Sequence, residues 1–181
     1  MKSLNEKELF STLIAEAEKA AFSGWDFSYI VRTGRQTDGA LPWSYGTEVL
    51  RWIKSSKSTL DMGTGGGELL SILATLPKNT CATEAYGPNV NVARRRLKPL
   101  GVKVFRIKEL QPLPFKNGQF DLIINRHTYY SEKEVFRMLK HGGVFITQQI
   151  GDLSFLLICA IRKVHCSIFS RKSHQAATVS L

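Results

Sequence analysis

The chain has 181 residues, a net charge of +10 and 43% hydrophobic residues. This length suits one domain with a buried core, and the apolar content argues against a disordered chain. The longest apolar run, residues 153–161, is about half of what a bilayer span requires, and the charged N-terminus lacks the features of a secretion signal. The three cysteines show no spacing typical of a zinc site. We therefore expect a soluble, cytoplasmic protein without a membrane span or a metal.

The first part of the chain, residues 1–57, is expected to form a helical and aromatic cap. Apolar residues recur at helical spacing over residues 4–22, and a second short helix is expected at 48–54. Between them, residues 25–45 are rich in Trp, Tyr and Phe. Such rings either cover a flat or apolar acceptor or pack onto the first helices, and the sequence leaves both open.

From residue 58 to residue 150, short apolar strands alternate with helical stretches. Strands are expected at residues 59–62, 80–84, 103–107, 120–125 and 143–149, and helices at 68–76, 88–97 and 132–139. Helices of this length between strands predict right-handed crossovers and a parallel sheet. The predicted fold is therefore α/β, with a doubly wound and mostly parallel sheet.

A glycine-rich loop follows the first predicted strand. Asp61 opens it, and glycines follow at alternate positions, namely Gly63, Gly65 and Gly67. In doubly wound sheets ligands bind at the carboxyl ends of the strands, where glycines let the backbone approach them. A dinucleotide fingerprint would need its third glycine where this chain has Glu68 or Leu70, so an NAD oxidoreductase fits poorly.

A second acidic residue, Glu84, ends the next predicted strand. A carboxylate there can accept both ribose hydroxyls of a nucleoside, each charge-assisted bond contributing about 1.5–3 kcal/mol. The acidic start of the glycine loop suits a cationic ligand without phosphate. Together these features favour S-adenosylmethionine (SAM), which carries an ammonium and a sulfonium.

Further motifs follow in order along the chain. They are Leu-Pro-Phe at residues 113–115, Asn-Gly at 117–118, Phe-Asp at 120–121 and Arg-Met-Leu-Lys-His-Gly-Gly at 137–143. With the glycine loop, they make residues 60–150 similar to the class I SAM-dependent methyltransferase family, in particular the group that includes quinone- and sterol-modifying enzymes. The resemblance implies a methyltransferase with SAM as its cofactor.

The resemblance also implies a role for each matching residue. Asp61 and the three glycines would frame the methionine part of SAM, and Glu84 would hold the ribose. Glu109 would receive the adenine amino group, and the backbone N–H of Leu110 would meet an adenine ring nitrogen. Asn125 would face the methionine carboxylate or the edge of the substrate.

A dedicated catalytic base is optional for this chemistry, because methyl transfer depends largely on holding the reactants in line. If a base is needed, His127 is the candidate, since it follows the fourth strand and titrates near neutrality. A loop histidine without catalytic duty is the alternative. Tyr129 and Tyr130 either line an acceptor pocket or pack onto the sheet.

Three functional interpretations follow. The leading one is a methyltransferase that acts on an unidentified small-molecule acceptor. The second is an RNA methyltransferase whose basic face lies between Arg94 and Lys108. Two kinds of nucleic-acid methyltransferase fit poorly. Enzymes that methylate base amino groups typically carry an Asn-Pro-Pro-Tyr element, which residues 125–128 lack. Enzymes that methylate a cytosine carbon need a cysteine nucleophile in a loop at a strand end, whereas Cys81 falls within a predicted strand. The third is a truncated SAM-binding or partner-binding protein without turnover.

Residues 151–181 are expected to form a C-terminal helix, over 153–161, and a basic tail. The family's sheet normally has seven strands and ends in an antiparallel hairpin, whereas this sequence predicts a fifth strand at 143–149 and little strand pattern after it. We therefore expect a short sheet or a chain truncated relative to the family. In either case, SAM binding should be retained more readily than catalysis.

Overall fold

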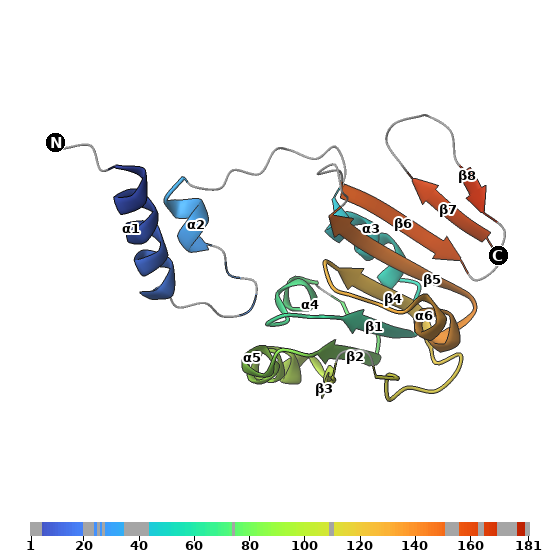
Figure 1. The fold of residues 1–181 in the computed structure, drawn as a ribbon. Coiled ribbons are helices and arrows are strands. Elements are labelled where there is room, and N and C mark those ends of the chain that lie inside the picture. The colour runs from blue at the N-terminus through green and yellow to red at the C-terminus, as the bar shows by residue number, and fades with distance from the viewer. Residues whose placement is uncertain are drawn as a thin grey trace.

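The fold is given by a computed structural model (Figure 1). It describes residues 5–19, 24, 26, 28–34, 44–73, 75–108, 111–150, 156–162, 165–169 and 177–179, with the backbone alone from residue 150 onward. Within these ranges, no helix combines the length and apolar character that a bilayer crossing demands.

A single sheet with the strand order β3-β2-β1-β4-β5-β6-β7-β8 organises the molecule. Its first five strands are all parallel: β1 (Ser58–Met62), β2 (Asn79–Glu84), β3 (Lys103–Arg106), β4 (Phe120–Arg126) and β5 (Leu139–Ile150). The order switches direction between β1 and β4, which is the place where doubly wound sheets bind ligands. The predicted parallel α/β fold is confirmed.

The fifth strand begins earlier than the sequence predicts. Leu139 already pairs with Phe120, and the register then shifts before Leu122 pairs with Val144. Gly142 lies in this irregular stretch with a φ of 76°. Gly142 and Gly143 therefore lie inside a bulged strand, because the preceding helix already ends at Met138.

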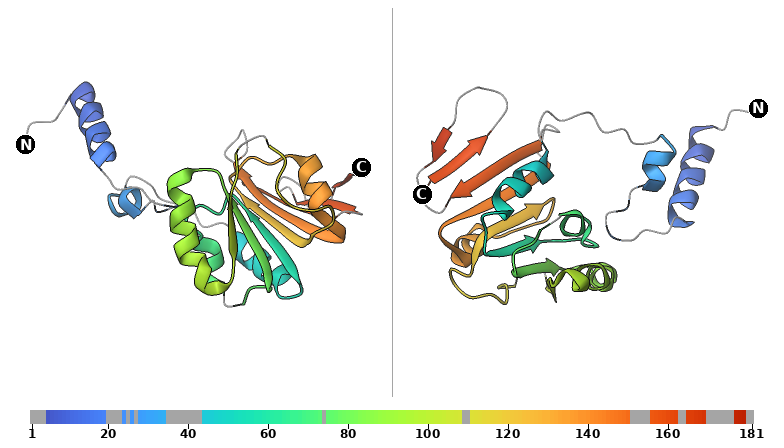
Figure 2. Two further views of the ribbon diagram at one scale, coloured as in Figure 1. Left: turned by 90° about the horizontal axis from the view of Figure 1, so that it is seen from below. Right: turned by 180° about the vertical axis from the view of Figure 1, so that it is seen from behind.

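Helices cover both faces of the parallel strands, and Figure 2 shows α3 and α6 on opposite sides. One buried apolar cluster lies under α3 (Tyr45–Ile53), α4 (Glu68–Ile72) and α5 (Gly87–Leu97), and the other under α6 (Glu132–Met138). Alternate residues of β4 serve the two clusters: Leu122 and Ile124 belong to the first, and Ile123 belongs to the second. A short 3-10 helix, η1 (Lys98–Leu100), follows α5.

The prediction of a helix over residues 153–161 is wrong for its described part, residues 156–161. Residues Leu156–Arg162 form β6, which pairs antiparallel with β5, and β7 (His165–Phe169) and β8 (Ala177–Val179) continue the sheet. The sequence pattern of a short apolar run fits a buried strand as well as a buried helix. Here the run forms a strand because it hydrogen-bonds to the free edge of β5. The sheet therefore does not end at β5 as expected.

The N-terminal residues form two helices, α1 (Glu6–Lys19) and α2 (Ser28–Arg32). They lie beyond the carboxyl ends of the parallel strands in Figure 1, and neither helix has a buried residue. Most of the aromatic stretch, including Trp25, Phe27 and Trp43, lies outside the described residues. A cap formed by residues 1–57 therefore stays a prediction.

Candidate functional site

A tight bend links β1 to α4 at the carboxyl edge of the sheet. All three glycines have positive φ angles, 68° at Gly63, 62° at Gly65 and 82° at Gly67. The Thr64 amide donates a hydrogen bond to the carbonyl of Thr83 on β2 (2.9 Å), which fixes the bend to the neighbouring strand. Gly63 also has no room for a side chain, because a Cβ there would lie 2.6 Å from the side chain of Thr128.

Glu84 lies directly beside this bend at the end of β2. Its Oε2 accepts a hydrogen bond from the Gly65 amide (2.7 Å), and its Oε1 accepts one from the Tyr86 amide (2.8 Å). Burial raises the pKa of Glu84, while these backbone hydrogen bonds oppose the shift. The two acidic positions noted in the sequence thus belong to one structural unit.

Asp61 is buried below the bend. Its Oδ2 accepts a hydrogen bond from the Thr64 hydroxyl (2.7 Å). Burial raises its pKa to about 7; the Thr64 hydrogen bond opposes this shift, and the negative charges of Glu84 and Glu68 add to it. Asp61 is not one of the described residues that line the adjoining cavity. Its carboxyl group therefore contacts the bend through Thr64.

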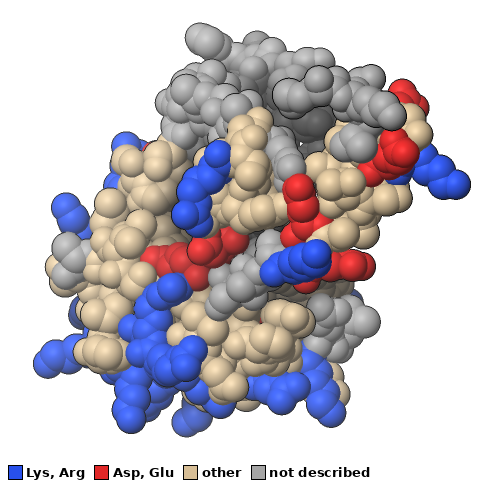
Figure 3. Space-filling model, turned by 90° about the vertical axis from the view of Figure 1, so that its left-hand side faces the viewer, with Lys and Arg blue, Asp and Glu red and all other residues tan. Residues whose placement is uncertain are grey.

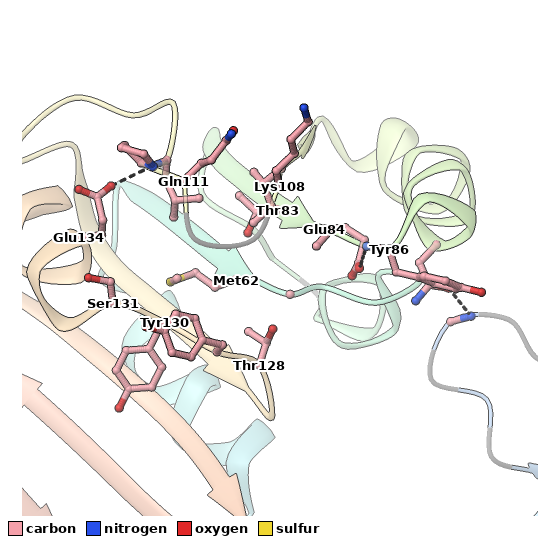
Figure 4. Close-up of a pocket in the computed structure, with 18 residues that line it drawn as sticks. Met62, Thr83, Glu84, Tyr86, Lys108, Gln111, Thr128, Tyr130, Ser131 and Glu134 are labelled. Carbon is pink, nitrogen blue, oxygen red and sulfur yellow. Dashed lines mark hydrogen bonds between the residues drawn. The ribbon is translucent and has the colours of Figure 1, made fainter.

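A cavity of about 550 Å³ opens at the carboxyl ends of β1 to β4 (Figure 4). Gly63 and Glu84 both line it, so the cavity joins the bend to the second acid. The opposite wall comes from the segments that follow β3 and β4. The other residues of the lining are Gly24, Met62, Thr83, Ala85, Tyr86, Asn89, Ile107, Lys108, Gln111, Pro112, Leu113, Thr128, Tyr129, Tyr130, Ser131 and Glu134.

Arg137 on α6 supports the wall that follows β3. It donates hydrogen bonds to the carbonyl of Phe115 (2.6 Å) and to Oε2 of Glu134 (2.7 Å). Glu134 in turn accepts the amide of Leu113 (2.9 Å), and the Arg137 carbonyl accepts the amide of Gly118 (2.8 Å). The Leu-Pro-Phe, Asn-Gly and Arg-x-Leu-Lys motifs therefore meet at one residue, Arg137. Sequence reasoning missed this role, although Glu134 and Arg137 stand one helical turn apart.

The Phe-Asp motif serves the other edge of the sheet. Asp121 accepts hydrogen bonds from the Ser58 amide (2.9 Å) and from Lys140 Nζ (3.1 Å), and so ties the amino ends of β1, β4 and β5 together. Burial raises the pKa of Asp121, but the hydrogen bonds from Ser58 and Lys140 outweigh it and lower the pKa overall.

Asn125 is fully buried at the end of β4 and is absent from the described lining of the cavity. Its Oδ1 accepts hydrogen bonds from Gln149 Nε2 (2.7 Å) and Thr147 Oγ1 (3.2 Å). Within the part of the chain that the structure describes, Asn125 Nδ2 has no hydrogen-bond partner. The side chain of Asn125 therefore links the carboxyl ends of β4 and β5.

His127 follows Asn125 in a left-handed backbone conformation, with a φ of 57°. Its amide donates a hydrogen bond to the carbonyl of Gln148 (2.9 Å), and it too is absent from the described lining. Burial lowers the pKa of its half-buried imidazole, and the charge of Arg126 lowers it further. The imidazole is therefore neutral near pH 7.

The two tyrosines that follow occupy different environments. The ring of Tyr130 lines the cavity and also packs edge-to-face on Phe145 of β5, with centroids 4.9 Å apart. Tyr129 is 71% exposed and stands at the rim. Glu109 and Leu110 lie outside the described residues, but their neighbours Lys108 and Gln111 line the cavity.

The basic residues between Arg94 and Lys108 do not act as one group. Arg96 donates to the carbonyl of Gly66 (2.8 Å) and pairs with Glu68, so it belongs to the bend. The others are exposed along α5, η1 and β3 and, for Lys108, just after β3. In the view of Figure 3, Lys and Arg side chains gather on the lower part of the molecule, below a group of acidic side chains.

Comparisons with known proteins agree with this arrangement. A family model described as a methyltransferase domain matches residues 60–147. A ubiquinone biosynthesis O-methyltransferase from Chelativorans sp. strain BNC1 is 29% identical over 99 residues, which cover 50% of this chain and 39% of that enzyme. The chain therefore spans about two fifths of the length of this curated relative.

Two solved structures share the fold. The N-methyltransferase NodS from Bradyrhizobium japonicum WM9, in complex with S-adenosylhomocysteine, superposes with a TM-score of 0.51 at 22% identity, covering 60% of this chain and 61% of NodS. The YcgJ protein from Bacillus subtilis superposes with a TM-score of 0.50 at 22% identity, covering 58% of this chain and 50% of YcgJ.

Proposed function

Through residues 60–147 this chain belongs to the methyltransferase-domain family, and from that premise we infer that it binds SAM and transfers the methyl group to a small-molecule acceptor. One observation carries the proposal: Gly63 of the bend and Glu84 at the end of β2 line the same cavity. A volume of about 550 Å³ lies in the range of sites that take small molecules and cofactors.

The donor side of the cavity suits a cationic nucleoside. A carboxylate has about four acceptor positions, so Glu84 can receive ribose hydroxyls in addition to the amides of Gly65 and Tyr86. Asp61, when ionised, adds negative charge beside the bend and also holds the bend through Thr64, whereas the charge of Glu68 is paired with Arg96. When bound, SAM would supply a methyl group already activated by its sulfonium.

The acceptor side is assigned to the wall beyond Gly63. Met62, Leu113 and Tyr130 give it an apolar and aromatic surface, which would exclude water and orient a flat or apolar acceptor. Thr128 lies against Gly63, where this wall meets the bend. Alignment of donor and acceptor would supply much of the rate without a covalent contribution from the protein.

We keep His127 as the candidate base for an acceptor that must lose a proton. Its neutral imidazole is able to accept one, and it directly precedes Thr128 in the wall. His127→Ala should lower kcat by about 100-fold if it acts in this way, with an unchanged Kd for SAM. An unchanged kcat would assign His127 to shaping the backbone.

Calorimetric titration of SAM, S-adenosylhomocysteine and NAD tests the proposed donor. The unaltered chain should bind the first two and reject NAD. Glu84→Gln, which keeps the side-chain volume but removes the charge, should weaken SAM binding by about tenfold or more. Glu132→Gln on the exposed start of α6 is the matched control and should leave the affinity unchanged. Tight NAD binding would contradict the proposal.

A second candidate function is RNA methylation. Arg106 and Lys108 are exposed and line a shallow hollow with Tyr86, next to the main cavity. A salt-sensitive gel shift of RNA that is lost in Arg106→Ala would favour this candidate, and unchanged mobility at low salt would count against it. SAM binding without S-adenosylhomocysteine production from any acceptor pool would favour the third candidate, a protein without turnover.

A further inference from the structure

Gly24 links the N-terminal part of the chain to the cavity. It lies between α1 and α2 in the sequence, and among the described residues before α3 it is the one that lines the cavity. Its amide donates a buried hydrogen bond to Oδ1 of Asn89 in the first turn of α5 (3.0 Å), drawn dashed in Figure 4. Asn89 is itself buried and lines the same cavity.

Gly24 lies so close to the bend that an added side chain would have to displace the carboxylate of Glu68. A Cβ at this position would overlap with Oε1 of Glu68 and would lie 3.2 Å from the Cα of Gly66. The Glu68 carboxylate has little freedom to move away, because its Oε2 accepts the amide of Gly66 (2.9 Å) and its Oε1 pairs with Arg96. The backbone of Gly24 is therefore matched closely to the bend.

The described helices on either side of Gly24 provide no comparable anchor. Neither α1 nor α2 has a buried residue, and Leu9, Phe10 and Val31 are exposed. In the part of the chain that the structure describes, the buried contact between this region and the cavity is therefore the one made by Gly24.

We propose that Gly24 is a positioning residue for SAM, which latches the N-terminal region onto the glycine bend and completes the cavity wall between the bend and α5. This inference rests on the proposed function, because it assigns SAM to the cavity beside Glu84. With the latch open, the bend loses a neighbour and water reaches the donor end of the cavity. The affinity for SAM then falls, although Gly24 contributes no side chain.

Two glycines allow a matched test. Gly24 and Gly34 have similar positive φ angles, 65° and 69°, but a Cβ on Gly34 would meet nothing within 4 Å. Gly24→Ala and Gly34→Ala therefore impose similar backbone strain, and Gly24→Ala alone also forces a clash with Glu68. In calorimetric titrations of the full chain, Gly24→Ala should raise the Kd for SAM about tenfold, and Gly34→Ala should leave it unchanged.

A double-variant cycle with Glu68→Ala separates the latch from a general loss of stability. Because Glu68→Ala removes the carboxylate atoms that an added Cβ would overlap and leaves only the 3.2 Å approach to the Cα of Gly66, the combined variant should bind SAM about fivefold more tightly than the two separate losses predict. Three results would overturn the latch. They are an equal Kd for SAM in Gly24→Ala and the unaltered chain, an equal loss of SAM affinity in Gly24→Ala and Gly34→Ala, and additive losses of affinity in the double variant. Failure of the unaltered chain to bind SAM would instead overturn the proposed function and the latch with it.

Discussion

The two edges of the parallel sheet each hold a partly or fully buried aspartate, but their surroundings differ. At the amino edge Asp121 has a cation beside it, Lys140, and its pKa is lowered. At the carboxyl edge Asp61 has only the Thr64 hydroxyl as a hydrogen-bond donor among the described contacts, and its pKa is raised to about 7. An acid paired with a cation of its own chain stabilises the fold, whereas an acidic group without one is suited to an external cation.

The glycines of the two edges give the sharpest test of this difference. Gly63→Ala should lower the free energy of unfolding by about 3 kcal/mol, from backbone strain and from a clash with the Thr128 side chain. Gly142→Ala at the amino edge has the same sign of φ but open space, and should cost about 1 kcal/mol. Urea unfolding measures both. Equal losses would mean that the contact with Thr128 is not tight.

Removal of the cation at the amino edge should affect stability alone. Lys140→Met deprives Asp121 of its ion pair and should lower the free energy of unfolding by about 1 kcal/mol, since the pair is partly exposed to solvent. The Kd for SAM should stay the same. Lys133→Met on the exposed surface of α6 is the control. A weaker affinity for SAM in Lys140→Met would show that the two edges are not independent.

The raised pKa of Asp61 predicts a smaller, pH-dependent effect. Between the ordinary pKa of 3.8 and about 7, the folded chain holds a proton on Asp61 that the unfolded chain has lost. The contribution of Asp61 to stability should therefore rise as the pH falls from 8 to 6. Unfolding of the unaltered chain and of Asp61→Asn at both pH values checks this, and parallel behaviour of the two proteins would contradict it.

SAM binding should show the opposite dependence on pH. A cation favours the ionised form of Asp61, so the affinity should fall as the pH drops below 7, by up to about tenfold per pH unit. Titrations in Asp61→Asn supply the reference, because the ammonium of SAM titrates equally in both experiments. If the two proteins have the same pH dependence, Asp61 does not sense the ligand.

Local patterns were sufficient to predict the parallel sheet. The alternation of apolar strands and helices identified β1 to β4 nearly to the residue, and the glycine spacing located the bend. The sequence pattern wrongly predicted a helix for residues 156–161, because a short apolar run fits either element and only its pairing with β5 makes it a strand. It could not reveal that Asn125 and His127 lie outside the described lining, since a residue at the end of β4 or just after it can face either side of the sheet or its end.

The least predictable parts of the site are backbone contacts between distant segments. Nothing in the residues around Gly24 indicates its hydrogen bond to Asn89, and the Arg137 network depends on carbonyl groups that any sequence possesses. Motifs located the bend and Glu84, while tertiary packing fixed the wall around them.

An NMR titration of the 15N-labelled chain with SAM tests the central claim most directly. Saturable shifts should appear at the amides of Gly63, Gly65 and Tyr86, which surround the bend and Glu84, while the amide of Gly142 at the other edge stays unchanged. Saturable binding of SAM that leaves the amides of the bend unmoved would contradict the account, because the donor would then lie outside the cavity that joins Gly63 to Glu84.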